Sequence, residues 1–336
     1  MSSISKNITV LGSGSWGTAL AILLARNGHH VKLWGRNSEA LLTMQSSRQN
    51  PRYLPDIEFP SHLNCETDFA KAVSDASEIL IVLPSYAFRE TCKQLQSTIA
   101  ADVPVIWASK GFEAGSLKLL HQVVAEELGG QRHTAVVSGP TFAKEVAIGL
   151  PTAMTVASSS EKYASHLADW LHNESFRAYT STDVIGVEVG GAVKNVMAIA
   201  AGIVDGLGLG ANTRAALITR GLAEIQRLGL TLGAKAETFM GLAGLGDLVL
   251  TCTDNQSRNR RVGIALAQGK NLEAALAELG QVAEGVNAAK QVNELAKKHQ
   301  VEMPIAEQVY AVLYENKSPK LALQELYSRA VKAETV

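Results

Sequence analysis

The chain has 336 residues, a length typical of two domains rather than one. Its 31 basic and 32 acidic side chains give a net charge of −1, which argues against a nucleic-acid-binding protein or one held on an acidic membrane surface. With 46% hydrophobic and 19% charged residues, the composition is that of a folded globular protein.

The cysteine pattern, the N-terminal residues and the short apolar runs favour a cytoplasmic protein. Three widely separated cysteines, with no CxxC pair, argue against a disulfide scaffold and a zinc site, so we expect no metal. Residues 1–6 lack the basic-then-apolar layout of a signal peptide. The longest apolar runs, such as residues 196–204, are shorter than the roughly 18 residues of a membrane span, so we expect no membrane insertion.

The first half of the chain alternates strands and helices. Residues 8–11 form a buried strand, a glycine-rich turn follows, residues 18–27 form a helix and residues 30–34 a second strand, which completes a βαβ unit. The same alternation continues with strands at 78–84, 104–108, 134–137 and 154–157, a helix at 88–99, and a helix that Ser116 caps and that ends at 128. This order predicts an α/β fold with a Rossmann-type, doubly wound, mostly parallel sheet.

The pattern changes near residue 183. Only helical periodicity follows, over residues 184–204, 213–228, 258–268, 272–279, 286–299 and 305–315. We therefore expect a dinucleotide-binding domain over 1–183 and an all-α substrate domain over 184–336. The proline-rich stretch 46–60 is predicted to be a long loop, either a lid or a plain surface loop.

A GxGxxG motif stands between the first strand and the first helix. Gly12 allows a tight turn, Gly14 lets backbone amides approach a pyrophosphate, and Gly17 allows close packing of the helix on the strand. No P-loop and no kinase element accompanies the motif. The context predicts a dinucleotide site rather than a purely structural turn.

The end of the second strand bears on which dinucleotide binds. An NAD site usually has an acidic residue there, whereas this chain has Gly35-Arg36-Asn37. The guanidinium of Arg36 suits a 2′-phosphate, so NADP(H) is favoured. The alternative is that Arg36 only stacks on adenine and that NAD(H) is used as well.

Two further segments follow predicted strands at the edge where doubly wound sheets bind ligands. Lys110 comes just after the strand at 104–108, and Gly139-Pro140-Thr141-Phe142-Ala143 follows the strand at 134–137. Lys110 is a candidate site residue; the alternative is a solvated lysine in a turn.

Lys194 is the most informative single residue. From 189 to 204 the only polar side chains are Lys194 and Asn195, and a helix that is apolar all round is buried. Burial lowers the pKa of a lysine and makes it a candidate acid/base, unless the side chain snorkels to the surface. Asp247, in an apolar glycine-rich segment, is either the partner of such a lysine or a helix cap.

The segment Ser257-Arg258-Asn259-Arg260-Arg261 opens a predicted helix with Ser257 as its N-cap. A helix N-terminus that carries arginine is suited to a phosphate group on a substrate. Nucleic-acid binding is disfavoured, because the net charge is −1 and no aromatic residues interleave the arginines.

Six motifs together resemble bacterial NAD(P)-dependent glycerol-3-phosphate dehydrogenases over nearly the whole chain. They are GSGSWGTALA from Gly12, ASKGFE around Lys110, SGPTFAKEV from Ser138, GGAVKNVMAIAAGIVDGLGLG from Gly190, GLAGLGDLVLTC from Gly241 and SRNRRVG from Ser257. The resemblance implies interconversion of dihydroxyacetone phosphate and sn-glycerol 3-phosphate, which supplies phospholipid synthesis.

The resemblance also implies roles for single residues. Lys194 matches the proton acceptor, and Lys110 and Asp247 would orient it and tune its pKa. Substrate-binding positions correspond to Lys110, Gly139, Thr141, Lys194, Asp247, Ser257, Arg258 and Asn259. Cofactor-binding positions correspond to Ser15, Trp16, Arg36, Lys110, Ala143, Arg258, Val282 and Glu284, beside the glycines Gly12, Gly14 and Gly17. Thr141 stands where many relatives have serine, which keeps the hydroxyl.

Two other functions remain open at this point. One is a reductase of similar plan that acts on a hydroxy acid or ketopantoate and would need a carboxylate clamp. The other is a redox sensor that binds NADP(H) without turnover, which leaves the embedded Lys194 unexplained. The oligomeric state is also open, a homodimer included.

Overall fold

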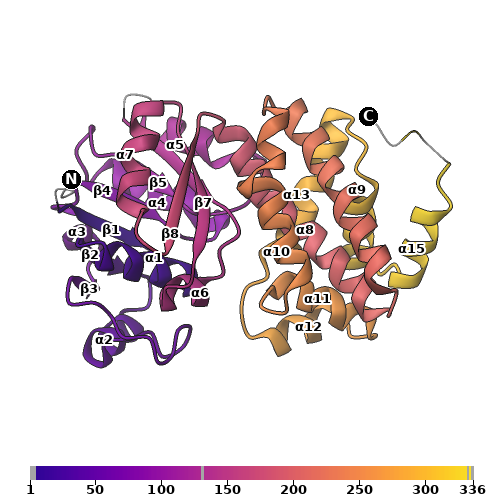
Figure 1. The fold of residues 1–336 in the computed structure, drawn as a ribbon, viewed down its shortest axis with the longest axis horizontal. Coiled ribbons are helices and arrows are strands. Elements are labelled where there is room, and N and C mark those ends of the chain that lie inside the picture. Colours follow the sequence, from indigo (N-terminus) through magenta and orange to yellow (C-terminus); the bar gives the residue numbers. More distant parts are fainter. Residues whose placement is uncertain (1–4, 130–131, 331–332, 334–336) are drawn as a thin grey trace.

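The computed structural model describes residues 5–129, 132–330 and 333, and it places an α/β part beside an all-helical part (Figure 1). The prediction that residues 1–6 form no signal peptide falls partly on residues 1–4, which lie outside the described residues. The strands are β1 (Asn7–Leu11), β2 (His30–Trp34), β3 (Leu63–Glu66), β4 (Glu78–Ile81), β5 (Val105–Trp107), β6 (Thr134–Ser138), β7 (Thr152–Ala157) and β8 (Phe176–Ser181).

These strands form one sheet in the order β3-β2-β1-β4-β5-β6-β7-β8. Strands β1 to β6 are parallel, whereas β7 pairs antiparallel with β6 and parallel with β8. The predicted mostly parallel, doubly wound sheet is confirmed. The strand order reverses direction between β1 and β4, and the crevice at that point is where such sheets bind ligands.

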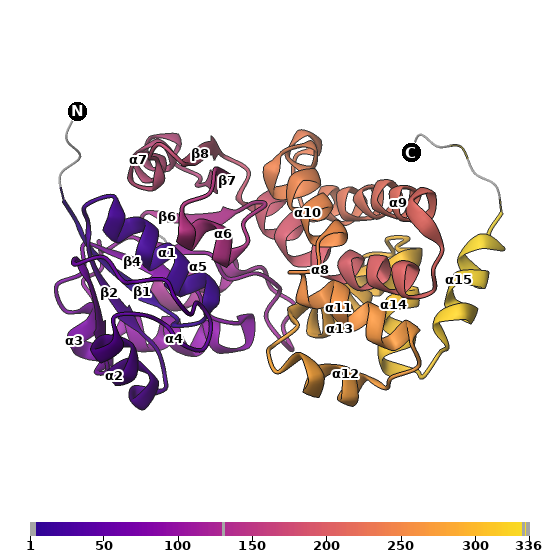
Figure 2. The same cartoon turned by 60° about the horizontal axis from the view of Figure 1, so that its bottom comes forward.

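Helices cover both faces of the sheet (Figure 2). Those of this part are α1 (Ser15–Arg26), α2 (Ser38–Ser47), α3 (Phe69–Val73), the 3-10 turn η1 (Ser85–Ala87), α4 (Phe88–Gln96), α5 (Leu120–Leu128), α6 (Ala143–Ile148) and α7 (Glu161–Leu171). One apolar cluster joins α1 and α7 to the sheet, and a second joins α3, α4 and α5 to the opposite face. Burial on both faces explains why the central strands carry apolar side chains on both faces.

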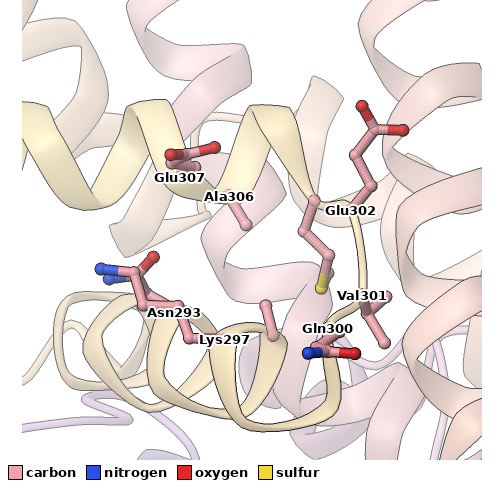
Figure 3. Close-up of a pocket in the computed structure, with 9 residues that line it drawn as sticks. Asn293, Lys297, Gln300, Val301, Glu302, Ala306 and Glu307 are labelled. Atoms are coloured by element: carbon pink, nitrogen blue, oxygen red, sulfur yellow. The ribbon is translucent and has the colours of Figure 1, made fainter.

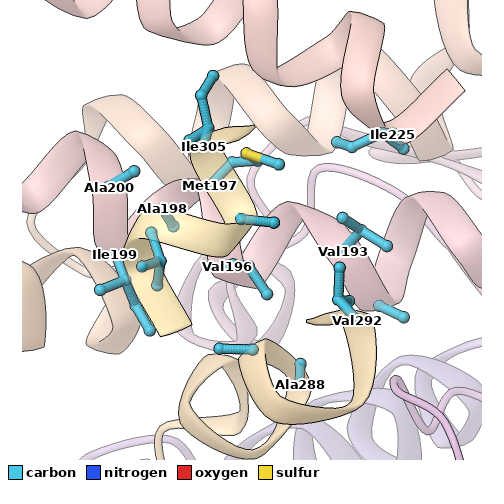
Figure 4. Packing of buried hydrophobic residues seen from close by; sticks show 14 of the residues in the cluster. Val193, Val196, Met197, Ala198, Ile199, Ala200, Ile225, Ala288, Val292 and Ile305 are labelled. Atoms are coloured by element: carbon cyan, nitrogen blue, oxygen red, sulfur yellow. The ribbon is translucent and has the colours of Figure 1, made fainter. Parts of the chain in front are cut away.

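The second part is helical, as predicted. Its elements are α8 (Val184–Gly206), α9 (Gly210–Thr231), η2 (Ala236–Met240), η3 (Leu242–Gly246), α10 (Asp247–Thr253), α11 (Arg258–Ala267), α12 (Leu272–Leu279), α13 (Glu284–His299), α14 (Pro304–Tyr314) and α15 (Pro319–Tyr327). Helix α8 lies at the centre, and residues of α9, α13 and α14 pack around it (Figure 4).

Glycines let α8 and α11 touch through their backbones. A Cβ atom on Gly202 of α8 would lie 2.0 Å from the Arg260 oxygen, and one on Gly263 of α11 would lie 2.1 Å from the Ile199 oxygen. Such spacing excludes any side chain between the two helices. The close approach leaves no room for water between α8 and α11 at these positions.

The length of α8 corrects one sequence-based expectation. Its longest uninterrupted apolar run is shorter than a membrane span, but α8 as a whole is long and apolar enough to cross a membrane, with a mean hydropathy of 1.5 over 18 residues. The protein itself buries 89% of that stretch. Burial inside the helical part accounts for its composition as that of a core helix.

Other predictions need correction at element ends. Ser116 does not cap α5, which begins at Leu120; the Ser116 hydroxyl instead donates to the Glu113 carboxylate. The proline-rich loop begins later than predicted, because α2 continues to Ser47. Edge strands β3 and β8 and the helices α2, α3, α6, α7, α10 and α15 lie where the sequence analysis assigned no element.

Candidate active site

A cleft of about 480 Å³ opens at the carboxyl edge of the sheet, where it faces α8, α10 and α11. The glycine loop after β1, the ends of β4 and β5, and the segment after β6 form one side of it. Most of the residues singled out from the sequence line this cleft: Gly14, Ser15, Trp16, Gly17, Lys110, Thr141, Ala143, Lys194, Asp247, Ser257, Arg258, Asn259, Val282 and Glu284.

The glycine loop has the conformation that its sequence predicts. Gly12 adopts a φ of +130°, and a Cβ there would lie 2.2 Å from the Val82 oxygen. A Cβ on Gly17 would lie 1.8 Å from the Gly12 oxygen, so the start of α1 packs directly on the turn. A Cβ on Gly14, by contrast, would meet no atom within 4 Å, and no side chain caps α1 there. The uncapped backbone amides at this open position fit a pyrophosphate.

Three of the predicted residues do not line the cleft. Gly12 packs against Val82, just after β4, and Gly139 packs against β7, where a Cβ would lie 2.9 Å from the Met154 Cα atom. Arg36 is exposed after β2. The turn before it rests on the glycine loop, since a Cβ on Gly35 would lie 2.2 Å from the Ser13 Oγ atom.

The loop after α2 forms another wall of the cleft. Asn50 anchors it, because its Nδ2 atom donates to Thr18 Oγ1 at 2.9 Å and to the Ser13 oxygen at 3.1 Å. Leu54, which lines the cleft, is only 2% exposed. The loop is therefore packed against the glycine loop.

Two lysines share one buried carboxylate at the floor of the cleft. Lys194 Nζ on α8 donates to Asp247 Oδ1 at 2.8 Å and to Thr251 Oγ1 at 2.7 Å. Lys110 Nζ, just after β5, donates to Asp247 Oδ2 at 2.6 Å. Thr251 in turn donates to the Asp247 main-chain oxygen at 2.6 Å. Asp247 thus joins a lysine of the sheet to a lysine of the central helix.

Burial and charge perturb both ionisable groups of the Lys194–Asp247 pair. Burial lowers the pKa of Lys194 to about 8, although the Asp247 carboxylate opposes this change. Burial also opposes ionisation of Asp247, but the charges of Lys110 and Lys194 outweigh it and hold the pKa of the carboxyl below its ordinary value. Lys194 can therefore gain and lose a proton near neutral pH, while Asp247 stays charged.

The three neighbouring arginines at the start of α11 point in different directions. Ser257 caps the helix, its Oγ atom accepting from the Arg260 amide. Arg260 turns away from the cleft and donates to Asp205 from Nε at 2.9 Å and from Nη2 at 2.6 Å. Arg258 and Arg261 line the cleft instead. The helical period thus assigns one arginine to packing and two to the cleft.

Asn259 has a supporting role in the cleft wall. Its Nδ2 atom donates to Asn195 Oδ1 at 2.9 Å, and its Oδ1 atom accepts from the Gly285 amide at 2.9 Å. It therefore holds together α8, α11 and the start of α13.

Sequence reasoning missed several cleft residues, among them Tyr53, Asn195, Thr251 and Gln256. Thr251 could have been found, because it lies four residues after Asp247 and shares its helix face. Tyr53 belongs to an irregular loop and gives no local signal.

A second groove, of about 270 Å³, lies between α13 and α14 (Figure 3). Asn293, Lys297, Gln300, Glu302 and Glu307 are among its lining residues. It contains none of the residues singled out from the sequence, so the cleft at the sheet edge is the candidate active site.

Family models for the N-terminal and C-terminal parts of NAD-dependent glycerol-3-phosphate dehydrogenase match residues 7–164 and 183–324. The chain belongs to this family. It is 56% identical over 335 residues to a glycerol-3-phosphate dehydrogenase (NAD(P)+) of Pseudoalteromonas translucida, with 99% of this chain and 100% of the relative covered.

Solved structures agree with this assignment. The family's enzyme from Coxiella burnetii superposes with a TM-score of 0.94 at 50% identity, covering 97% of this chain and 99% of that one. A ketopantoate reductase from Ralstonia eutropha superposes with a TM-score of 0.59 at 15% identity, covering 96% and 99%. The second likeness shows a shared fold alone.

Proposed function

We propose that this chain interconverts dihydroxyacetone phosphate and sn-glycerol 3-phosphate with NAD(P)H, with Lys194 as the acid/base. The pairing of Lys194 and Lys110 with the buried Asp247 carries the proposal, together with membership of the family. Bound reduced nicotinamide would supply the hydride. The Gly14–Gly17 turn, with Ser15 and Trp16, would hold the dinucleotide against α1.

The proton step follows from the position of Lys194. As an ammonium it donates a hydrogen bond to the substrate carbonyl oxygen, polarises the ketone and gives its proton to the forming alkoxide. In the reverse direction the neutral amine takes the hydroxyl proton. A pKa of about 8 lets one side chain serve both directions near neutral pH.

The substrate phosphate would bind at the start of α11. Ser257 and Arg258 line the cleft there, and Lys110 and Thr141 line it from the sheet side. Asn259 holds this wall in place through Asn195 and the Gly285 amide. We assign Ala143, Val282 and Glu284 to the cofactor side of the cleft, on the resemblance alone.

For the cofactor, we propose a preference for NADPH over NADH. The second strand ends without an acidic residue, and Arg36 stands exposed beside the turn that touches the glycine loop. A guanidinium there can pair with a 2′-phosphate. Replacing Arg36 by glutamate should therefore raise the KM for NADPH at least ~10-fold and leave the KM for NADH nearly unchanged.

We also propose where the enzyme acts in the cell and how its parts are organised. We place the enzyme in the cytoplasm, without membrane insertion, where its product would supply phospholipid synthesis. The burial of α8 supports the lack of insertion. We further propose that domains 1–183 and 184–336 each supply one wall of the cleft, that catalysis needs no metal, and that a homodimer is the state to test first.

The deciding experiment mixes the purified protein with dihydroxyacetone phosphate and measures the oxidation of NADPH and, in parallel, of NADH. Fast oxidation with NADPH and slower oxidation with NADH supports both the reaction and the assignment of Arg36. Turnover of ketopantoate or a 2-keto acid in its place would favour the other reductases. Binding of NADPH without turnover of any ketone would favour a sensor. Competition by inorganic phosphate tests the start of α11.

A further inference from the structure

The charges that line the cleft differ in sign from the charge of the whole chain. Five cationic side chains line it against two carboxylates: Lys110, Lys144, Lys194, Arg258 and Arg261 against Asp247 and Glu284. The cleft therefore has an excess of three positive charges, in a chain whose net charge is −1. Charge of one sign in a cleft focuses the field and attracts ligands of opposite sign.

Two of these cations have no role in the reaction centre. Lys144, on α6, and Arg261, on α11, are exposed. Neither has a hydrogen-bond or ion-pair partner among residues 5–129, 132–330 and 333. Lys110 and Lys194 differ from them, because both pair with Asp247. Lys144 and Arg261 thus form no ion pair with the described residues, although the charge of Arg261 also acts on Glu278 and helps to lower the pKa of that carboxyl.

The two cations come from different parts of the chain but lie near one junction. Glu145, the neighbour of Lys144, accepts a hydrogen bond from Gln256 Nε2 at 2.8 Å. This contact joins α6 to the segment that leads into α11. Arg261 lies one turn along α11 from Arg258, on the same side of the helix.

We propose that Lys144 and Arg261 form a cationic entrance that draws phosphate-bearing ligands into the cleft. The proposal rests on the proposed function, in which the substrate and the dinucleotide both carry phosphate. The two side chains would act through their field on the approaching anion rather than by contact with the reacting atoms. They should therefore raise kcat/KM and leave kcat nearly unchanged.

Ionic strength provides the test. Screening shortens the reach of a charge from about 30 Å at 0.01 M salt to about 10 Å at 0.1 M. The K144Q/R261Q variant should lose about 10-fold in kcat/KM for dihydroxyacetone phosphate at low salt, within the ~10- to 1,000-fold range of such effects. Its kcat should stay within about 2-fold of the parent, and the difference should shrink as salt rises.

A matched control removes the same charge elsewhere. Lys298 on α13 and Lys320 on α15 are exposed and lie outside the cleft lining. The K298Q/K320Q variant should keep the salt dependence of the parent protein. If it lost as much kcat/KM as K144Q/R261Q, net charge rather than the entrance would be responsible, and the proposal would be wrong.

Two further outcomes would overturn the proposal. An unchanged kcat/KM at low salt would show that the entrance has no effect, and a loss that persists at high salt would indicate direct contact. The same salt series is run on NADPH binding, followed by tryptophan fluorescence. That readout needs no turnover, so it separates failure of the entrance from failure of the proposed reaction.

Discussion

Replacing Asp247 by asparagine should shift the pH dependence of ketone reduction to lower pH. The substitution keeps the shape of the side chain and an oxygen that can accept from Lys194. It removes the negative charge that lies 2.8 Å from the Lys194 Nζ atom. Because Lys110 remains, its positive charge then disfavours the ammonium form of Lys194 without compensation.

The size of the shift can be bounded from the geometry. Two unit charges 2.8 Å apart attract by roughly 6 kcal/mol at an effective dielectric constant of ~20. At about 1.4 kcal/mol per pKa unit this corresponds to roughly four units. The retained hydrogen bond and water in the open cleft reduce the effect, so we expect a fall of at least about one unit. The midpoint should move from about 8 to about 7 or below.

The assay measures kcat/KM for dihydroxyacetone phosphate across pH, because this quantity reports the free enzyme. Reduction needs the ammonium form, so activity falls as pH rises through the pKa of Lys194, and in the variant this fall should occur earlier. Oxidation of glycerol 3-phosphate needs the neutral amine, so its rise with pH should move in the same direction.

A matched variant separates charge from hydrogen bonding. Thr251→Val removes the neutral acceptor of Lys194 but keeps the carboxylate, so it should shift the midpoint less than Asp247→Asn. Retained NADPH binding would show that the cleft is intact. An unchanged or raised midpoint in the asparagine variant would refute the assignment of Asp247 as the group that tunes Lys194.

Three further predictions concern binding and stability. Arg258→Ala should raise the KM for dihydroxyacetone phosphate about 10- to 100-fold and weaken inhibition by inorganic phosphate, since a charged hydrogen bond contributes about 1.5–3 kcal/mol; an unchanged KM would argue against the phosphate role. Gly263→Ala should lower the unfolding free energy by roughly 1–3 kcal/mol in denaturant titrations, because its Cβ would lie 2.1 Å from the Ile199 oxygen. Burial raises the pKa of Glu78 to about 7, so the stability that its proton contributes is present at low pH and lost as pH rises toward 7; in Glu78→Gln, urea titrations should show about 3 kcal/mol less of this pH-dependent loss.

The buried strands were predictable from sequence because each central strand is apolar on both faces. Edge strands lack that signal: β3 buries only Leu63 fully and β8 only Phe176. Their positions follow from pairing with a neighbour, which a local pattern cannot show. Helix α5 also begins without a serine cap: its N-cap is Leu119, whose amide donates to Gln122 Oε1 at 3.0 Å.

The site, too, has features that the sequence predicts and features that it does not. The embedding of Lys194 in an apolar helix predicts its burial, and the lone carboxylate of Asp247 predicts a cationic partner. Helical spacing separates Arg260 from Arg258 and Arg261, but the partner of Arg260 was not predictable by local reasoning, because Asp205 lies 55 residues away in the sequence. The helical period divides the arginines between two faces, and contacts between distant segments decide which of these faces meets the cleft.

The packing of α8 contributes to the proton chemistry of Lys194. Glycines at 202 and 263 bring α8 and α11 into backbone contact, and Gly190 does the same toward Ala243, where a Cβ would lie 2.5 Å from the oxygen. This packing excludes water from the faces of α8 that meet its neighbours and leaves Lys194 only 7% exposed, at the cleft. Burial is in turn the largest influence on its pKa, which a hydrated lysine would have near 10.5. A substitution that loosens these contacts should therefore raise the pKa of Lys194 as well as lower stability, even though it touches no group in the cleft.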